Sequence, residues 1–182
     1  LGSTYLDIAK DKGAIIKPNV PVIYAVKNEE ALKYIRDLAE SQNAKPIELD
    51  REIIIISEDD EFTYRYKDYE LETIILDMIG EHQKENASLA ITALIELNEE
   101  NNIELDFNKM IDAIESVCWT GRIEQVKENP LIIIDGAHNN ESVEALVSTI
   151  KNYYDLEKMD ILFSAIKGKP VTEMLSKLQS LS

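Results

Sequence analysis

Residues 131–146, Leu131-Ile-Ile-Ile-Asp-Gly-Ala-His-Asn-Asn-Glu-Ser-Val-Glu-Ala-Leu146, decide the fold of the second half of the chain. The apolar run 131–134 predicts a buried strand, Asp135-Gly136 interrupts it, and apolar residues then recur at helical spacing. In an open α/β sheet, ligands bind at the C-terminal ends of strands, beside the start of the following helix. The order strand, short loop, helix therefore predicts an α/β fold with a candidate site in this loop.

The loop itself offers side chains suited to a nucleotide. Asp135 follows the strand directly, Gly136 allows another group to approach the backbone, and His138 precedes the helix. A helix N-terminus adds unpaired N–H groups and a partial positive charge. The simpler alternative is an Asp-Gly turn followed by an Asn cap, and these residues alone fit both interpretations.

Composition excludes several classes of protein. Among 182 residues, 35 are acidic and 19 basic, so the net charge of −16 argues against binding to nucleic acid. No apolar run approaches the ~20 residues that span a bilayer, and we expect no signal peptide. The single cysteine, Cys118, fits a reducing compartment. We therefore expect a cytoplasmic protein without a membrane partner, and a buried Cys118.

The first half alternates between two patterns. Residues 21–26, a helix after Asn28 and residues 46–49 predict a βαβ unit with parallel strands. Residues 52–76 predict an antiparallel meander, in which cross-strand packing is the expected role of the tyrosines rather than a base-stacking platform. A long helix follows from Glu81, with its apolar face formed by leucines and alanines between positions 89 and 97. A second helix is expected at about 108–117.

Residues 119–122 are the expected domain joint, because helical periodicity stops there. The strands 123–127, 131–134 and 159–165 and two helices predict the order β–β–α–β–α for residues 122–182, with Pro170 in the first turn of the last helix. Arg122 can present a planar guanidinium to phosphate, or form a surface ion pair. The lysines at 10, 12 and 17 fit a solvated basic turn as well as a site.

Four blocks together resemble a known family. They are Asp135-Gly-Ala-His-Asn139, Gly121-Arg122, His82-Gln83 with Asn86-Ala87, and the opening segment up to Lys17. Their order is similar to folylpolyglutamate synthase and bifunctional dihydrofolate synthase, which are Mur-ligase-like amide ligases. The resemblance implies an α/β fold: the latter part of the central ATPase domain in residues 1–119, then the first half of a Rossmann-like C-terminal domain in residues 120–182.

The resemblance also implies a reaction and site residues. ATP phosphorylates the carboxylate of a folate or of dihydropteroate, and the amine of L-glutamate attacks the acyl phosphate. Asn86 would contact the adenine side of ATP, Arg122 the phosphates and Asp135 the ribose. His138 would lie near the phosphates and the incoming substrate as a catalytic residue. Lys12 matches a lysine that the family carbamylates, which would make it catalytic and a ligand for Mg²⁺. We expect a monomer at full length.

Some family features are absent or changed. The phosphate-binding motif Gly-x-x-Gly-Lys-Ser/Thr does not occur in the sequence, so we expect an internal fragment that is inactive alone. Thr120 and Asn140 stand where proline is common, and Lys167-Gly-Lys169 replaces Asp-Lys-Asp. Two alternatives stay open, another Mur-like amino-acid ligase and a non-catalytic nucleotide-binding relative. The His-Gln pair and the spacing from Arg122 to Asp135 favour the folate branch.

Overall fold

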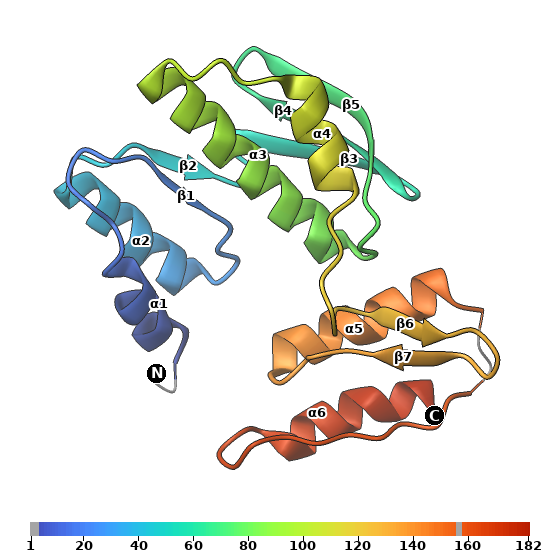
Figure 1. Ribbon diagram of the computed structural model, residues 1–182. Helices are drawn as coiled ribbons and strands as arrows, with labels where there is room; N and C mark the ends of the chain where they lie inside the picture. Colours follow the sequence, from blue (N-terminus) through green and yellow to red (C-terminus); the bar gives the residue numbers. More distant parts are fainter. Residues whose placement is uncertain (1–3, 156–157) are drawn as a thin grey trace. The chain divides into compact units, whose positions relative to one another are not determined.

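The computed structural model describes residues 4–155 and 158–182 (Figure 1). The chain forms two compact units. Unit 1 comprises Leu1–Ile74 and Glu85–Ile111, and unit 2 comprises Ile75–Lys84 and Asp112–Ser182. None of the helices in the described ranges combines the length and the apolar character that crossing a membrane would require.

Unit 1 begins with a helical pair and two parallel strands. Helix α1 (Tyr5–Gly13) packs on α2 (Glu29–Ser41). Gly13 allows this close approach, because a Cβ there would lie 2.8 Å from Leu38 Cδ2. Strands β1 (Val22–Tyr24) and β2 (Pro46–Glu48) flank α2 in sequence and pair in parallel. The predicted βαβ unit is confirmed, and Asn28 caps α2 by accepting the Ala31 N–H at 3.1 Å.

The predicted three-stranded segment is also present in unit 1. Strands β3 (Ile53–Glu58), β4 (Glu61–Tyr66) and β5 (Tyr69–Ile75) form one sheet in the order β3-β4-β5, with β3 and β4 antiparallel. Phe62, Tyr64 and Tyr66 are all buried. Tyr64 and Tyr66 lie opposite Ile55 and Ile53 in the strand register, as expected for cross-strand packing. Helices α3 (Glu81–Asn101) and α4 (Phe107–Glu115) follow.

The prediction of the buried face of α3 was wrong. Leu94 and Leu97 are 38% and 49% exposed, whereas Ser88 and Thr92 are fully buried beside Ile91 and Ile95. Thr92 Oγ1 donates to the Ser88 carbonyl at 2.7 Å and accepts from the Tyr64 hydroxyl, 2.8 Å away. These bonds satisfy the hydroxyl groups of Thr92 and Tyr64, which allows a polar residue in the buried stripe, whereas Ser88 Oγ has no hydrogen-bond partner among the described residues.

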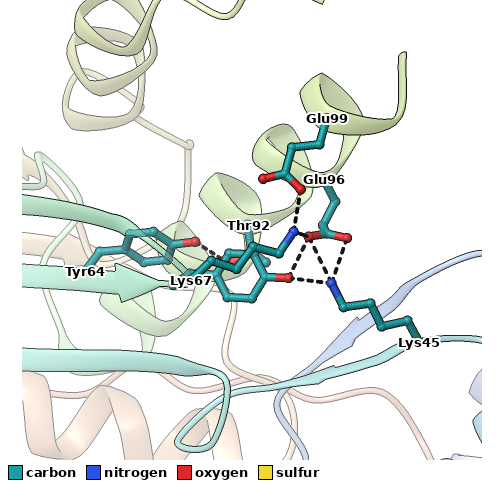
Figure 2. Close-up of polar contacts among 7 residues, drawn as sticks. Lys45, Tyr64, Lys67, Thr92, Glu96 and Glu99 are labelled. Carbon is teal, nitrogen blue, oxygen red and sulfur yellow. Dashed lines mark hydrogen bonds and ion pairs between the residues drawn. The ribbon is translucent and has the colours of Figure 1, made fainter. Parts of the chain in front are cut away.

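A charged network joins β4, α3 and the segment before β2 (Figure 2). Glu96 accepts hydrogen bonds from the Tyr66 hydroxyl at 2.6 Å, from Lys45 at 3.4 Å and from Lys67, which also binds Glu99. Burial by itself raises the pKa of Glu96, but the bonds from Lys67 and Tyr66 outweigh it, and the pKa is lowered. The ionised carboxylate therefore stabilises the contact of the sheet with α3.

Unit 2 contains a two-stranded sheet and two packed helices. Strands β6 (Glu124–Lys127) and β7 (Ile132–Ile134) are antiparallel. Helix α5 (Asn140–Tyr153) packs on α6 (Val171–Leu178), which leads into the 3₁₀ turn η1 (Gln179–Leu181). The shared core is formed by buried side chains from both helices: Val143, Met174 and Leu178.

Several sequence-based expectations for unit 2 were wrong. Residues 159–165 form no strand, and the Met159 N–H donates to the Leu181 carbonyl at 3.1 Å rather than to a strand. Ile132 and Ile134 are 42% and 49% exposed, because one face of the two-stranded sheet is uncovered in the described ranges. Cys118 is exposed after α4 instead of buried. Pro170 is the N-cap of α6 and not part of its first turn.

Candidate functional site

The loop between β7 and α5 is organised by the carboxylate of Asp135. Its Oδ1 accepts the N–H of Ala137 at 2.7 Å, which closes a tight turn, and its Oδ2 accepts the N–H of Ile123 at 2.9 Å. The second bond joins this loop to the start of β6. Gly136 donates its N–H to the Gly121 carbonyl at 2.8 Å. The group that approaches Gly136 closely, as its lack of a side chain allows, is therefore the backbone of Gly121.

His138 lies immediately before the cap of α5. The His138 Nδ1 atom is 2.9 Å from the Gly136 carbonyl oxygen. Because a carbonyl only accepts, we assign the proton to Nδ1, which leaves the lone pair on Nε2 in the neutral ring. The side chain is exposed. The imidazole is therefore oriented by the loop and offers Nε2 to a ligand.

A capping box fixes the first turn of α5. Asn139 Oδ1 accepts the Ser142 N–H at 2.8 Å, and Ser142 Oγ accepts the N–H groups of Asn139 and His138, each at 3.1 Å. The simple Asn cap considered from the sequence is thus present, together with the Asp135 turn. Ser142 was missed as a positioning residue, although the spacing Asn139 to Ser142 is that of an N-cap and N3.

Arg122 is exposed beside this loop, within the same unit. The backbone N–H of Arg122 donates to the Trp119 carbonyl at 3.1 Å. Within residues 4–155 and 158–182, no carboxylate pairs with its guanidinium, so the surface ion pair considered from the sequence is not formed. Unit 2 therefore brings together three of the five predicted site residues, Arg122, Asp135 and His138, at the N-terminus of α5.

The start of α5 is also tied to α6. Asn140, at a position where the family that the sequence resembles commonly has proline, donates its side-chain amide to Glu173 of α6. Lys177 donates to the Asn140 carbonyl at 3.3 Å and pairs with Glu144. Asn140 therefore has a structural role that a proline could not fill. The basic loop 167–169 precedes α6, but the expected strand before that loop is absent in the described residues.

A glycine that the sequence analysis did not single out packs tightly in unit 2. Gly80, just before α3, has φ +110°, and a Cβ there would lie 2.6 Å from Thr149 Oγ1 of α5. It would also lie 2.9 Å from His82 Cε1. Only glycine fits this conformation and this space. No local sequence signal marks the position, because the close neighbour on α5 is distant in sequence.

Lys12 and Asn86 lie in unit 1. Lys12 is near the end of α1, its side chain is 70% exposed, and its Nζ lies 3.9 Å from Asp11 Oδ2. Asn86 is an exposed residue early in α3, four positions after His82 as predicted. Among the described residues, no three His, Cys, Asp or Glu side chains cluster as ligands for a metal ion.

Comparison with known proteins gives a consistent result. Dihydrofolate synthase/folylpolyglutamate synthase of Bacillus subtilis is 35% identical over 187 residues, which cover all of this chain and 44% of that protein. A solved folylpolyglutamate synthase complex with AMPPCP and folate has a TM-score of 0.88 at 23% identity, and covers all of this chain and 45% of that one. Folylpolyglutamate synthase of Mycobacterium tuberculosis complexed with ADP has a TM-score of 0.86 at 22% identity, with coverage of 100% and 42%.

The two solved structures show that the chain has the mixed α/β fold of part of those enzymes. A search of family models finds no match. The chain spans less than half the length of the curated relatives that it matches. Along this span, the chain is homologous to ligases of the folylpolyglutamate synthase/dihydrofolate synthase type.

Proposed function

We propose that this chain is part of an ATP-dependent ligase that adds glutamate to a folate, to dihydropteroate, or to both. One observation carries the proposal: Arg122, Asp135 and His138 meet at the N-terminus of α5, with the guanidinium unpaired among the described residues. The names of the matched relatives, and the AMPPCP, folate and ADP in the solved structures, support this choice of substrates.

The chemistry has two steps. A carboxylate oxygen of the acceptor attacks the γ-phosphorus of ATP, and ADP leaves. The amine of glutamate then attacks the acyl carbon, loses a proton as the amide forms, and inorganic phosphate leaves with the former carboxylate oxygen. Both steps move negative charge among phosphate oxygens, so positioned cations and N–H donors supply most of the stabilisation.

Each site residue suits one part of this reaction. The Arg122 guanidinium is a planar donor for phosphate oxygens, and the start of α5 adds a favourable dipole. Each oxygen of Asp135 accepts one N–H and retains capacity for a ribose hydroxyl. His138 Nε2 can accept a hydrogen bond from the incoming amine or a protonated phosphate oxygen. The Asn86 carboxamide can both donate to and accept from the edge of adenine.

The assignment of residues 1–119 to the central ATPase domain and 120–182 to the C-terminal domain is part of this proposal. So is the inactivity of the 182 residues alone, since the Gly-x-x-Gly-Lys-Ser/Thr motif does not occur in them. Mg²⁺ that accompanies ATP is part of this proposal, and no step is derived through it.

A chimeric ligase tests the function. The present sequence replaces the matched segment of the Bacillus subtilis relative, and ADP release is measured with ATP, glutamate and either dihydropteroate or tetrahydrofolate. We expect glutamate-dependent turnover that Arg122→Ala reduces strongly, while Arg51→Ala, another exposed arginine, leaves it unchanged. The preferred acceptor names the activity. A folded chimera that binds ATP but turns over neither acceptor would contradict the proposal and favour the binding-module alternative.

A further inference from the structure

The peptide that carries Arg122 is held on both sides by carboxylates. On one side, the Gly121 N–H donates to Glu124 Oε2 at 2.8 Å. On the other side, the Ile123 N–H donates to Asp135 Oδ2 at 2.9 Å. Hydrogen bonds to ionised acceptors are stronger than those between neutral groups. The backbone on either side of Arg122 is therefore fixed by two charge-assisted bonds from different parts of the sequence.

The turn also contains an unusual backbone conformation. Ile123 has φ +48° and is only 6% exposed. The left-handed region is unfavourable for a β-branched residue and persists only when the surroundings hold it in place. The bond from Ile123 to Asp135 and the burial of the isoleucine side chain supply that restraint. Residues held in this way concentrate at ligand sites.

The carboxylates of this turn bind amides and leave the arginine unpaired. Glu124 and Asp135 both lie close to Arg122 in sequence or space, yet no carboxylate in the described ranges pairs with its guanidinium. An arginine with its charge neutralised by an ion pair would bind phosphate less well. Because Glu124 and Asp135 accept backbone N–H groups, they anchor the turn and leave the Arg122 guanidinium available to a ligand.

We propose that Glu124 is a positioning residue which, together with Asp135, clamps the backbone around Arg122 and so presents the guanidinium to the phosphates of a nucleotide. Glu124 makes its contact with the Gly121 N–H, and the Gly121 carbonyl in turn accepts the Gly136 N–H. Glu124 therefore also supports the β7–α5 loop. This inference rests on the proposed nucleotide-binding function, and its test separates the clamp from that function.

The first measurement is amide hydrogen exchange in the ligand-free chain. In Glu124→Ala, we expect the Gly121 amide to exchange about tenfold or more faster, because its acceptor is gone. Glu124→Gln keeps an acceptor oxygen and should restore most of the protection. Glu128→Ala, at a nearby exposed glutamate, should have no effect. Unchanged amides of Val143 and Met174 show that the core stays folded. Unchanged exchange at Gly121 in Glu124→Ala would overturn the inference.

The second measurement compares the affinities of the chain for ADP and for adenosine. Glu124→Ala should weaken ADP binding about tenfold and leave adenosine binding within about twofold, since only ADP has phosphates for Arg122. Arg122→Ala should do the same, and the double variant should lose little more, because both changes remove one coupled contact. Equal losses for both ligands, or additive losses in the double variant, would overturn the inference.

The two measurements together distinguish the positioning role of Glu124 from the phosphate-binding role of Arg122. If Arg122→Ala leaves ADP affinity unchanged while Glu124→Ala still frees the Gly121 amide, the phosphate role of Arg122 fails, and with it the functional part of the inference. If Arg122→Ala weakens ADP binding but Glu124→Ala does not, the proposed function stands and Glu124 is not a positioning residue.

Discussion

Replacing Asp135 by alanine should destabilise unit 2 measurably, even without any ligand. The side chain accepts two backbone hydrogen bonds, from Ile123 at 2.9 Å and from Ala137 at 2.7 Å. Alanine removes both acceptors and supplies none. The Ile123 amide belongs to a residue that is 6% exposed, so water reaches it poorly after the change.

The expected loss follows from these contacts. Each hydrogen bond to a charged group contributes about 1.5 kcal/mol or more, and a buried donor left without a partner costs about 1–3 kcal/mol. Relief of the left-handed conformation at Ile123 would return about 1 kcal/mol. We therefore expect Asp135→Ala to lower the free energy of unfolding by about 2–3 kcal/mol. Asp135→Asn retains one acceptor oxygen and should cost about half as much.

Urea unfolding followed by the fluorescence of Trp119, the single tryptophan and a residue of unit 2, measures this loss. Asp160→Ala, at an exposed aspartate, is the matched control. A change below about 0.5 kcal/mol in Asp135→Ala, similar to that of an ordinary surface substitution, would refute the structural role of the carboxylate.

Three further outcomes are expected. Gly80→Ala should destabilise the chain by about 2–4 kcal/mol in urea unfolding, because it adds backbone strain and places a Cβ only 2.6 Å from Thr149 Oγ1. A change near zero would show that the turn can shift. The pKa of Glu96 is lowered, so its stabilisation is complete above pH 4.5 and lost as the pH falls through the folded value. Glu96→Gln should therefore flatten the acid limb of the stability curve, whereas Glu100→Gln should leave it unchanged, and equal curves for wild type and Glu96→Gln would contradict this account. The isolated chain should carry an unmodified Lys12, because its side chain is 70% exposed and no described cluster of metal ligands surrounds it to hold a carbamate. A ¹³C carbamate signal from labelled bicarbonate, lost in Lys12→Arg, would contradict that expectation.

Local patterns in the sequence predicted the elements that depend on near neighbours. The strand–loop–helix order around Asp135, the cap at Asn139 and the parallel pair around α2 all follow from periodicity and capping within a few residues. The grouping of Arg122 with Asp135 and His138 was expected from the family resemblance. The resemblance did not indicate which hydrogen bonds hold the loop. These bonds join Ile123 to Asp135 and Gly121 to Gly136, which are 12 and 15 positions apart, so no local pattern marks them.

The failures share a physical cause, which is dependence on distant partners. The apolar run at 131–134 suggested burial, but Ile132 and Ile134 are exposed because burial requires a covering layer. The segment 159–165 has the composition of a strand, but among the described residues no neighbouring strand completes its hydrogen bonds. In α3, leucines indicated one face, whereas the buried face carries Ile91 and Ile95 and contacts the sheet, where Thr92 bonds to Tyr64.

The most direct test of the central claim is the effect of ADP on the backbone amide and arginine side-chain resonances of the chain. We expect ADP to shift the amides of residues 135–140 and the Nε resonance of Arg122. In Arg122→Ala, the ADP concentration that saturates these loop shifts in the wild type should no longer saturate them. ADP binding that shifts other residues and leaves this loop unchanged, or loop shifts that survive in Arg122→Ala with the same affinity, would contradict the claim that the start of α5 is the phosphate site.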